Sequence, residues 1–141
     1  MYNCSMYSLT TKIRVRYGET DQMGFVYYGV YAQYYEVGRV ELLRSLGISY
    51  KKLEEEGYLL PVVNFEINYK KAAHYDDELK IKTSINSLPT AKITFEYKTY
   101  NTKNKLLNSG KVVLAFVDKS SMKPTLSPDL ILEKIKSKLQ N

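Results

Sequence analysis

The order of one long helical segment and several alternating segments is what most constrains the fold of this chain. Residues 29–46 carry apolar side chains and one glycine at helical spacing, and Gly47 follows at a position typical of a helix C-cap. The residues of this stripe are Tyr31, Tyr34, Tyr35, Gly38, Leu42 and Leu46. Glycine in a helix interior costs about 1 kcal/mol relative to alanine. The place of Gly38 on the stripe therefore indicates that the helix closely approaches a sheet or another chain.

Segments with a two-residue alternation predict five strands. They span residues 11–17, 60–70, 78–86, 92–100 and 106–117. A loose terminus is expected for residues 1 to about 9. Gly110 lies inside the last strand and indicates a bulge there.

Two shorter helices complete the pattern. Ser49 and Gly57 bracket one of them as its N-cap and its stop signal. Ser127, Pro128 and Asp129 supply a cap, a first-turn proline and a first-turn acid for a closing helix. Strands that follow one long helix predict a single α+β domain over residues 1–141, with an antiparallel sheet covered by the helix on one face.

Composition limits the class of partner. With 141 residues, 44% of them hydrophobic and 26% charged, the chain has the size and composition of one globular domain. The net charge of +6 favours anionic partners. The lysines are scattered and no nucleic-acid-binding module appears, so nucleic acid is not expected. A phosphorylated cofactor would use the same positive charge, although most individual lysines are expected to be solvated surface residues.

The chain contains one cysteine, Cys4, and one histidine, His74. A single cysteine excludes an intramolecular disulfide and any site with several cysteine ligands, so no metal is expected and His74 is expected to face solvent. The N-terminal residues lack the basic and apolar regions of a signal peptide. The longest uncharged run, residues 22–35, is too short and too polar to span a bilayer. A cytoplasmic protein without a membrane span is expected.

The candidate catalytic residues lie within residues 17–39. Asp21 lies in a turn between Gly18 and Gly24, and the next acid along the chain is Glu36. Between the two acids lie five tyrosines and no charged residue. A lone carboxylate just before a helix, beside apolar surface, suits acid–base or nucleophilic chemistry. An aspartate in a turn is also a common Asx-turn or cap residue, which is its default role.

This stretch resembles a known family. The pattern Tyr-x-x-Thr-Asp-x-x-Gly-x-Val-Tyr, followed by Tyr31, Tyr34-Tyr35-Glu36 and Arg39, resembles the hotdog-fold acyl-CoA thioesterases of the 4-hydroxybenzoyl-CoA thioesterase / tol-pal-associated acyl-CoA thioesterase type. Leu60-Pro61 and Tyr75-Asp76-Asp77-Glu78 extend the resemblance into the later strands.

The resemblance implies a hotdog fold, in which an antiparallel sheet of about five strands wraps around one long helix, with a short C-terminal helix. It implies hydrolysis of an acyl-CoA or acyl carrier protein thioester to the free acid, without a metal or another cofactor beyond the coenzyme A of the substrate. Family members usually pair their sheets edge to edge and build the active site between two subunits. A homodimer or homotetramer is therefore expected.

By the resemblance, Asp21 attacks the thioester carbonyl or activates the water that attacks it. The amide of Tyr28 or Gly29, at the start of the long helix, is expected to hold the oxyanion. Glycine at position 29 lets a substrate carbonyl approach the backbone closely. Many relatives carry His at the position of Tyr28. Because tyrosine is a poor base at physiological pH, Tyr28 is expected to shape the pocket.

The resemblance also assigns substrate contacts. The residues expected to bind the substrate are Tyr27, Tyr31, Leu60, Pro61, Val62 and Val63, of which the last four line the acyl pocket in relatives. The last four also suit the hydrophobic core. Lys119 and Lys123, in the loop after the last strand, are candidates for contact with the phosphates of coenzyme A, and a plain polar loop is the alternative.

Other polar residues near Asp21 have structural expectations. Glu19 is expected to be a solvated turn residue, and a like charge that raises the pKa of Asp21 is the alternative. Thr20 is expected to hydrogen-bond the turn. Glu36 and Arg39 are three residues apart and are expected to pair on one helix face.

Two rival functions stay open. A hotdog hydratase or dehydratase would use a histidine with a carboxylate, and no histidine lies near Asp21 in the sequence. A non-catalytic acyl-CoA-binding or regulatory module is kept open by Tyr28. The sequence favours thioester hydrolysis, and it leaves open the acyl group, the carrier and the number of subunits.

Overall fold

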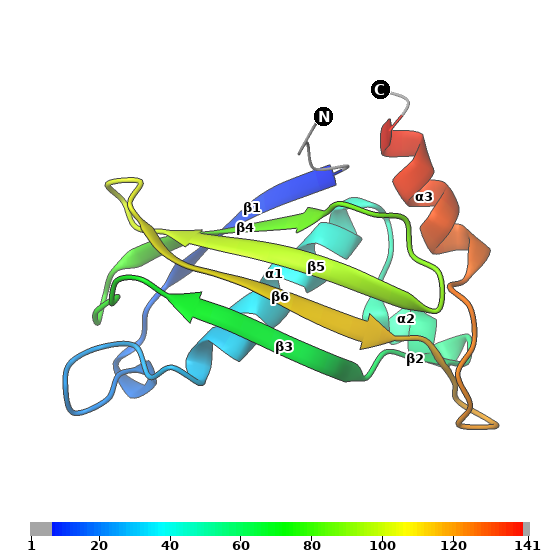
Figure 1. Cartoon of the computed structure of the whole chain (residues 1–141), viewed down its shortest axis with the longest axis horizontal. Helices are drawn as coiled ribbons and strands as arrows, with labels where there is room; N and C mark the ends of the chain where they lie inside the picture. Colours follow the sequence, from blue (N-terminus) through cyan, green and yellow to red (C-terminus); the bar gives the residue numbers. More distant parts are fainter. Residues whose placement is uncertain (1–6, 140–141) are drawn as a thin grey trace.

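The computed structural model describes residues 7–139 (Figure 1). Cys4, and with it the expectation about disulfides, lies outside these residues. The helices are α1 (Val30–Ser45), α2 (Tyr50–Glu55) and α3 (Asp129–Leu139), with a 3-10 turn, η1, at Tyr17–Glu19. The strands are β1 (Tyr7–Arg14), β2 (Tyr58–Leu59), β3 (Val62–Tyr69), β4 (Glu78–Ile85), β5 (Lys92–Tyr100), β6 (Leu106–Ala115) and β7 (Val117–Asp118).

Five strands form one antiparallel sheet in the order β1-β4-β5-β6-β3, while β2 and β7 pair separately. The long helix α1 lies against one face of this sheet, and α3 lies near β1 (Figure 1). The edge strands are therefore β1 and β3. This arrangement confirms the α+β architecture expected from the sequence, with one long helix, a five-stranded antiparallel sheet and a short C-terminal helix.

Local sequence signals placed most elements within a few residues. The predicted long helix over residues 29–46 is α1, and Ser49 caps α2 by accepting a hydrogen bond from the amide of Lys52 at 3.2 Å. The prediction for the first strand was wrong in its bounds, because β1 begins at Tyr7 and ends at Arg14. Its first residues pair with the end of β4, where Tyr7 lies opposite Ile85. A partner this distant in sequence leaves no local signal.

The predicted apolar stripe of α1 packs on the sheet, and all its members are buried. The ring of Tyr35 stacks on that of Tyr97 in β5, with 4.0 Å between centroids and 2° between planes. A Cβ atom at Gly38 would collide with the hydroxyl of Thr83 in β4. Gly38 therefore allows α1 to approach the sheet closely, as its place on the stripe predicted.

The bulge expected at Gly110 was wrong. Gly110 keeps a regular register, opposite Ile67 on β3 and Tyr97 on β5. A Cβ atom there would lie 2.5 Å from a ring carbon of Tyr35 and 2.7 Å from the carbonyl oxygen of Glu66. Glycine is needed at this position because the ring of Tyr35 crosses over the strand.

Gly110→Ala is expected to destabilise the fold by about 1–3 kcal/mol, because Tyr35 and the backbone of β3 must shift to admit a methyl group. Gly18→Ala is the matched control, since no atom lies within 4 Å of a Cβ atom built there. Urea unfolding followed by circular dichroism measures both variants. Equal free energies of unfolding for the two would contradict the packing role of Gly110.

Candidate active site

Asp21 organises a tight loop between η1 and α1. Its amide donates to the carbonyl of Phe25 at 2.8 Å, and the amide of Gly24 donates to its carbonyl at 2.9 Å. The carboxylate oxygen Oδ1 accepts from the amides of Met23 at 2.9 Å and Phe25 at 3.2 Å. Gly24 has φ of +83°, a conformation that favours glycine. Asp21 thus has the Asx-turn role that is the default for a turn aspartate, and this role fixes its direction.

The same turn leaves the second carboxylate oxygen of Asp21 available. No donor within the described part of the chain bonds to Oδ2, and the side chain is half-buried. A structural role and a chemical role are therefore compatible here, because each uses a different oxygen.

The helix α1 begins without a side-chain cap. Gly29 is its N-cap residue, and the amide of Val30 bonds back to the carbonyl of Tyr27 at 2.9 Å. Across residues 7–139, the amides of Tyr28 and Gly29 find no hydrogen-bond acceptor. Two free N–H groups therefore precede α1, where the helix dipole adds positive potential.

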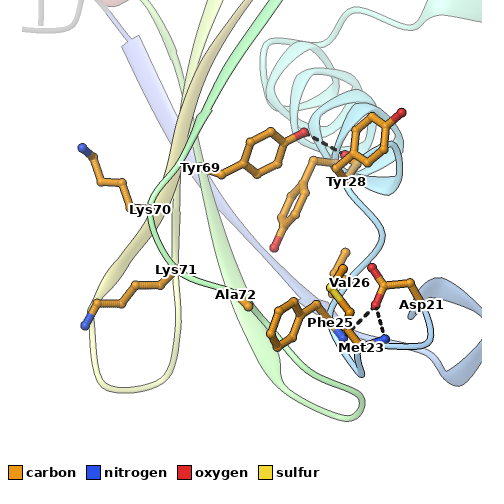
Figure 2. A pocket seen from close by; sticks show the side chains of 10 residues that line it. Asp21, Met23, Phe25, Val26, Tyr28, Tyr69, Lys70, Lys71 and Ala72 are labelled. Carbon is orange, nitrogen blue, oxygen red and sulfur yellow. Dashed lines mark hydrogen bonds between the residues drawn. The ribbon is translucent and has the colours of Figure 1, made fainter.

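A pocket of about 300 Å³ lies between this loop, the start of α1 and the end of β3 (Figure 2). Its lining residues are Asp21, Met23, Phe25, Val26, Tyr28, Tyr31, Tyr69, Lys70, Lys71 and Ala72. Tyr69 joins two of its walls, because its hydroxyl donates to the carbonyl of Tyr28 at 3.0 Å. The pocket is therefore mainly aromatic and apolar, with the carboxylate of Asp21 on one wall.

Three of the predicted site residues, Asp21, Tyr28 and Tyr31, line this pocket, and Gly29 adjoins it at the helix start. Burial raises the pKa of Tyr31 to about 12, so its hydroxyl stays neutral. Tyr27 is exposed beside the pocket, with its ring 4.7 Å from that of Tyr28. Its pKa is raised, mainly by the neighbouring hydroxyl of Tyr28 and to a smaller extent by the charge of Asp21.

The other predicted substrate-binding residues do not line this pocket. They are Leu60, Pro61, Val62, Val63, Lys119 and Lys123. At about 3.3 Å per residue, the two ends of β3 are roughly 23 Å apart, so residues 60–63 do not reach the pocket at Tyr69 within one chain. The amide of Lys119 bonds to the carbonyl of Gly57 at 2.9 Å, and the loop after β7 lies at the same far end of the sheet (Figure 1).

Glu19 is not the solvated turn residue expected from the sequence. It is 9% exposed, and its carboxylate accepts from Arg16 at 2.9, 3.0 and 2.8 Å and from the hydroxyl of Tyr34 at 2.8 Å. Burial opposes ionisation, but the hydrogen bonds from Arg16 and Tyr34 outweigh it and hold the pKa of Glu19 below its ordinary value. The carbonyl of Glu19 accepts the amide of Tyr27 at 2.9 Å. Glu19 thus fixes the Asp21 loop both to α1 and to the segment before the free amides.

The expected ion pair of Glu36 and Arg39 is not among those formed by the described residues. Arg39 is 7% exposed, and its Nε donates to the hydroxyl of Tyr50 in α2 at 3.0 Å. The guanidinium therefore joins α1 to α2. The expectation for Thr20 is confirmed, because its hydroxyl donates to the carbonyl of Tyr17 at 2.8 Å.

Several lining residues were missed by sequence reasoning. They are Met23, Phe25, Val26, Tyr69, Lys70, Lys71 and Ala72. The first three lie within the motif of residues 17–27, and Tyr69 ends an alternating strand. Their position in these two sequence patterns was the only signal that could have indicated a place in the pocket. The pocket itself depends on a contact between distant loops, in which the amide of Val26 bonds to the carbonyl of Ala73 at 2.9 Å. His74 beside it is exposed, as expected.

Among residues 7–139, no three His, Cys, Asp or Glu side chains gather in a way that could hold a metal ion. Within the same part of the chain, no helix has the length and apolar character needed to cross a membrane.

Residues 15–135 match the model of the Thioesterase-like superfamily. The chain belongs to this superfamily. It is 41% identical over 113 residues to "Putative acyl-CoA thioesterase YneP" of Bacillus subtilis, which covers 80% of this chain and 82% of the relative. It is 35% identical over 124 residues to acyl-CoA thioester hydrolase YbgC of Escherichia coli, with 88% and 92% covered.

Among solved structures of this thioesterase-like group, DHNA-CoA thioesterase from Staphylococcus aureus superposes with a TM-score of 0.86 at 33% identity. The superposition covers 94% of this chain and 91% of that one. The hotdog fold expected from the motif is thereby confirmed.

Glu19→Gln is expected to lower the free energy of unfolding by about 1–3 kcal/mol near pH 7, because a charged acceptor is lost from a buried site. The pKa of Glu19 is lowered on folding, so the ionised form stabilises the fold above its ordinary value of 4.5, and this contribution is lost as the pH falls below 4.5. The difference between wild type and variant should therefore shrink at acidic pH.

Urea unfolding near neutral pH and below pH 4.5 measures this difference. Glu54→Gln, at an exposed position of α2, is the control and should change stability little at either pH. A difference for Glu19→Gln that persists unchanged at acidic pH would show that its charge is unimportant.

Proposed function

We propose that this protein is an acyl-CoA thioesterase that hydrolyses an acyl-CoA thioester to a free carboxylic acid and coenzyme A. The observation that carries the proposal is one pocket with a free carboxylate oxygen of Asp21 on its wall and the free amides of Tyr28 and Gly29 at its edge. The names of YneP and YbgC, which describe acyl-CoA thioester hydrolysis, support the same chemistry.

Hydrolysis needs a nucleophile for the thioester carbonyl and donors for the oxyanion. Either Oδ2 of Asp21 attacks the carbonyl carbon, or it takes a proton from a water whose oxygen attacks. In both routes the carbonyl oxygen gains negative charge that the amides of Tyr28 and Gly29 would stabilise. The C–S bond then breaks, and the thiolate of coenzyme A leaves and takes up a proton. In the direct route, water opens the anhydride at Asp21 in a second step.

The side chain of Tyr28 is not needed for the donor role. Its backbone supplies the amide, its carbonyl is held by the hydroxyl of Tyr69, and its ring is 63% exposed. A tyrosine in place of the histidine found in many relatives therefore leaves the oxyanion donors intact. This supports a working enzyme over the non-catalytic binding module.

The edge strand β3 supports a homodimer. Its apolar residues Val62, Val63, Phe65 and Tyr69 are between 39% and 51% exposed. A long edge strand with exposed apolar side chains is prone to pair with another strand. We propose that the β3 strands of two copies pair antiparallel across a two-fold axis. A tetramer and a cytoplasmic location stay predictions of the sequence.

Antiparallel pairing would bring the start of one β3 beside the end of the other. Residues 60–63 of the partner subunit would then approach the pocket at Tyr69. The acyl-binding role predicted for Leu60, Pro61, Val62 and Val63 is therefore proposed to operate across the interface.

Asp21→Asn is expected to lower kcat/KM about 100- to 10,000-fold, because an amide neither attacks a carbonyl nor accepts a proton from water as a carboxylate does. The amide oxygen of Asn can still accept the hydrogen bonds that the amides of Met23 and Phe25 donate to Oδ1, so the loop should persist. The measurement is thiol release from short aliphatic, long-chain and aryl acyl-CoA thioesters.

Asp129→Asn, at the exposed start of α3, is the control and should keep wild-type rates. Equal rates for wild type and Asp21→Asn would remove Asp21 from the mechanism. Tight acyl-CoA binding by the wild type without thiol release would instead favour the non-catalytic module.

Phe65→Arg is expected to convert the dimer to a monomer and to reduce thiol release at least tenfold, because two like charges would meet near the centre of the paired strands. Asn68→Arg is the control, since it places the same charge on the opposite, polar face of β3. Light scattering after size-exclusion chromatography gives the mass of each variant. A wild-type monomer with full activity would contradict the proposed assembly.

A further inference from the structure

The pocket has a cationic side away from Asp21. Lys70 and Lys71 directly follow the last residue of β3 and line the pocket. Their amides both donate to the carbonyl of Leu107 on β6, at 2.8 and 3.0 Å, which fixes the backbone from which both side chains leave. Figure 2 shows the two side chains extending away from Asp21, on the other side of the pocket.

Neither lysine has an anionic partner among the described residues. Both are exposed, and the ion pairs of this part of the chain involve other cations. The nearest acids along the chain have other neighbours, since Glu66 pairs with Lys111, and Asp76 and Asp77 lie beside Arg14 and His74. Two adjacent positive charges without an ion-pair partner favour an anion at this side of the pocket.

We propose that Lys70 and Lys71 bind the phosphate groups of the coenzyme A part of the substrate, an inference that rests on the proposed thioester hydrolysis. Acyl-CoA carries its reactive carbonyl at one end of a long uncharged arm and its phosphates at the other. The pocket follows the same order, with Asp21 on one side, aromatic residues such as Tyr69 between, and the two ammonium groups opposite. A thioester held at Asp21 presents its phosphates to these lysines as the arm leaves the pocket.

Lys119 and Lys123 are the alternative phosphate ligands. Within one chain they lie at the end of the sheet away from the pocket. Their loop is ordered by Asp118, whose carboxylate accepts hydrogen bonds from Ser120 at 2.9 and 2.8 Å. In the proposed dimer this loop of the partner subunit would lie on the same side as its residues 60–63. The two pairs of lysines are therefore tested by separate double variants.

The test compares binding of coenzyme A with binding of pantetheine, which has the same arm without the phosphates. Titration calorimetry on the full chain needs no turnover. Lys70→Ala/Lys71→Ala is expected to weaken coenzyme A binding about tenfold and to leave pantetheine binding unchanged. Added salt should weaken coenzyme A binding to the wild type more than to this variant.

Lys134→Ala/Lys136→Ala is the matched control, because it removes two exposed positive charges from α3, near the opposite edge strand β1. Equal weakening in both double variants would overturn the inference, since net charge alone would explain it. So would a wild type that binds coenzyme A no tighter than pantetheine, or a loss seen only in Lys119→Ala/Lys123→Ala.

Thiol release from acyl-CoA and from the matching acyl-pantetheine is measured in parallel. Absence of release from both with the expected change in affinity would contradict the proposed hydrolysis and leave the phosphate site standing. Thiol release from both substrates, with a coenzyme A affinity that is unchanged in Lys70→Ala/Lys71→Ala, would support the proposed hydrolysis and contradict the phosphate site.

Discussion

The buried carboxylate of Glu19 is the contact on which the geometry of the site depends. It joins Arg16, at the start of the loop, to Tyr34, on the buried stripe of α1. Its own carbonyl holds the amide of Tyr27, one residue before the free amides. The carboxylate of Asp21 and the two amides proposed as oxyanion donors are therefore both positioned relative to α1. A buried charge is favourable only while its donors stay in place, which leaves this loop few alternative arrangements.

The start of α1 gives up stability that a cap would provide. A capping side chain typically contributes about 1 kcal/mol, and Gly29 provides none. The loss is offset elsewhere, because the stripe of α1 is buried and Gly38 lets the helix approach β4 closely. The two amides left unpaired can donate hydrogen bonds to a ligand. A carbonyl oxygen that gains negative charge accepts them most strongly in the transition state, which is where binding accelerates a reaction.

The sequence predicted those features of the fold and of the site that depend on neighbouring residues, and missed those that depend on contacts between distant segments. The stripe of α1 and the alternation of β4 and β5 are local patterns, and they placed these elements almost to the residue. The expectation for Gly110 was wrong because its close neighbour Tyr35 is far away in the chain. The expectation for Glu19 was wrong because its carboxylate is buried between nearby Arg16 and Tyr34 of α1. The motif drew attention to Asp21, whereas the second wall of the pocket depends on how β3 meets the loop. Nothing local marks Lys70 or Lys71 as part of the same cavity.

Three features of the molecule lie along the strand β3. Its apolar side chains are exposed, residues 60–63 lie roughly 23 Å from the pocket, and the two unpaired lysines follow its last residue. The other edge, β1, has α3 beside it, whereas within the described part of the chain no helix lies beside β3 in this way (Figure 1). The proposed two-fold pairing of β3 would cover the exposed side chains and would bring residues 60–63 to the pocket of the partner. Each strand would supply its end to its own pocket and its beginning to that of the partner. Two subunits would then exclude water from a carboxylate and two amides that a single chain leaves open, and charge stabilisation at the thioester is stronger in such a water-poor site.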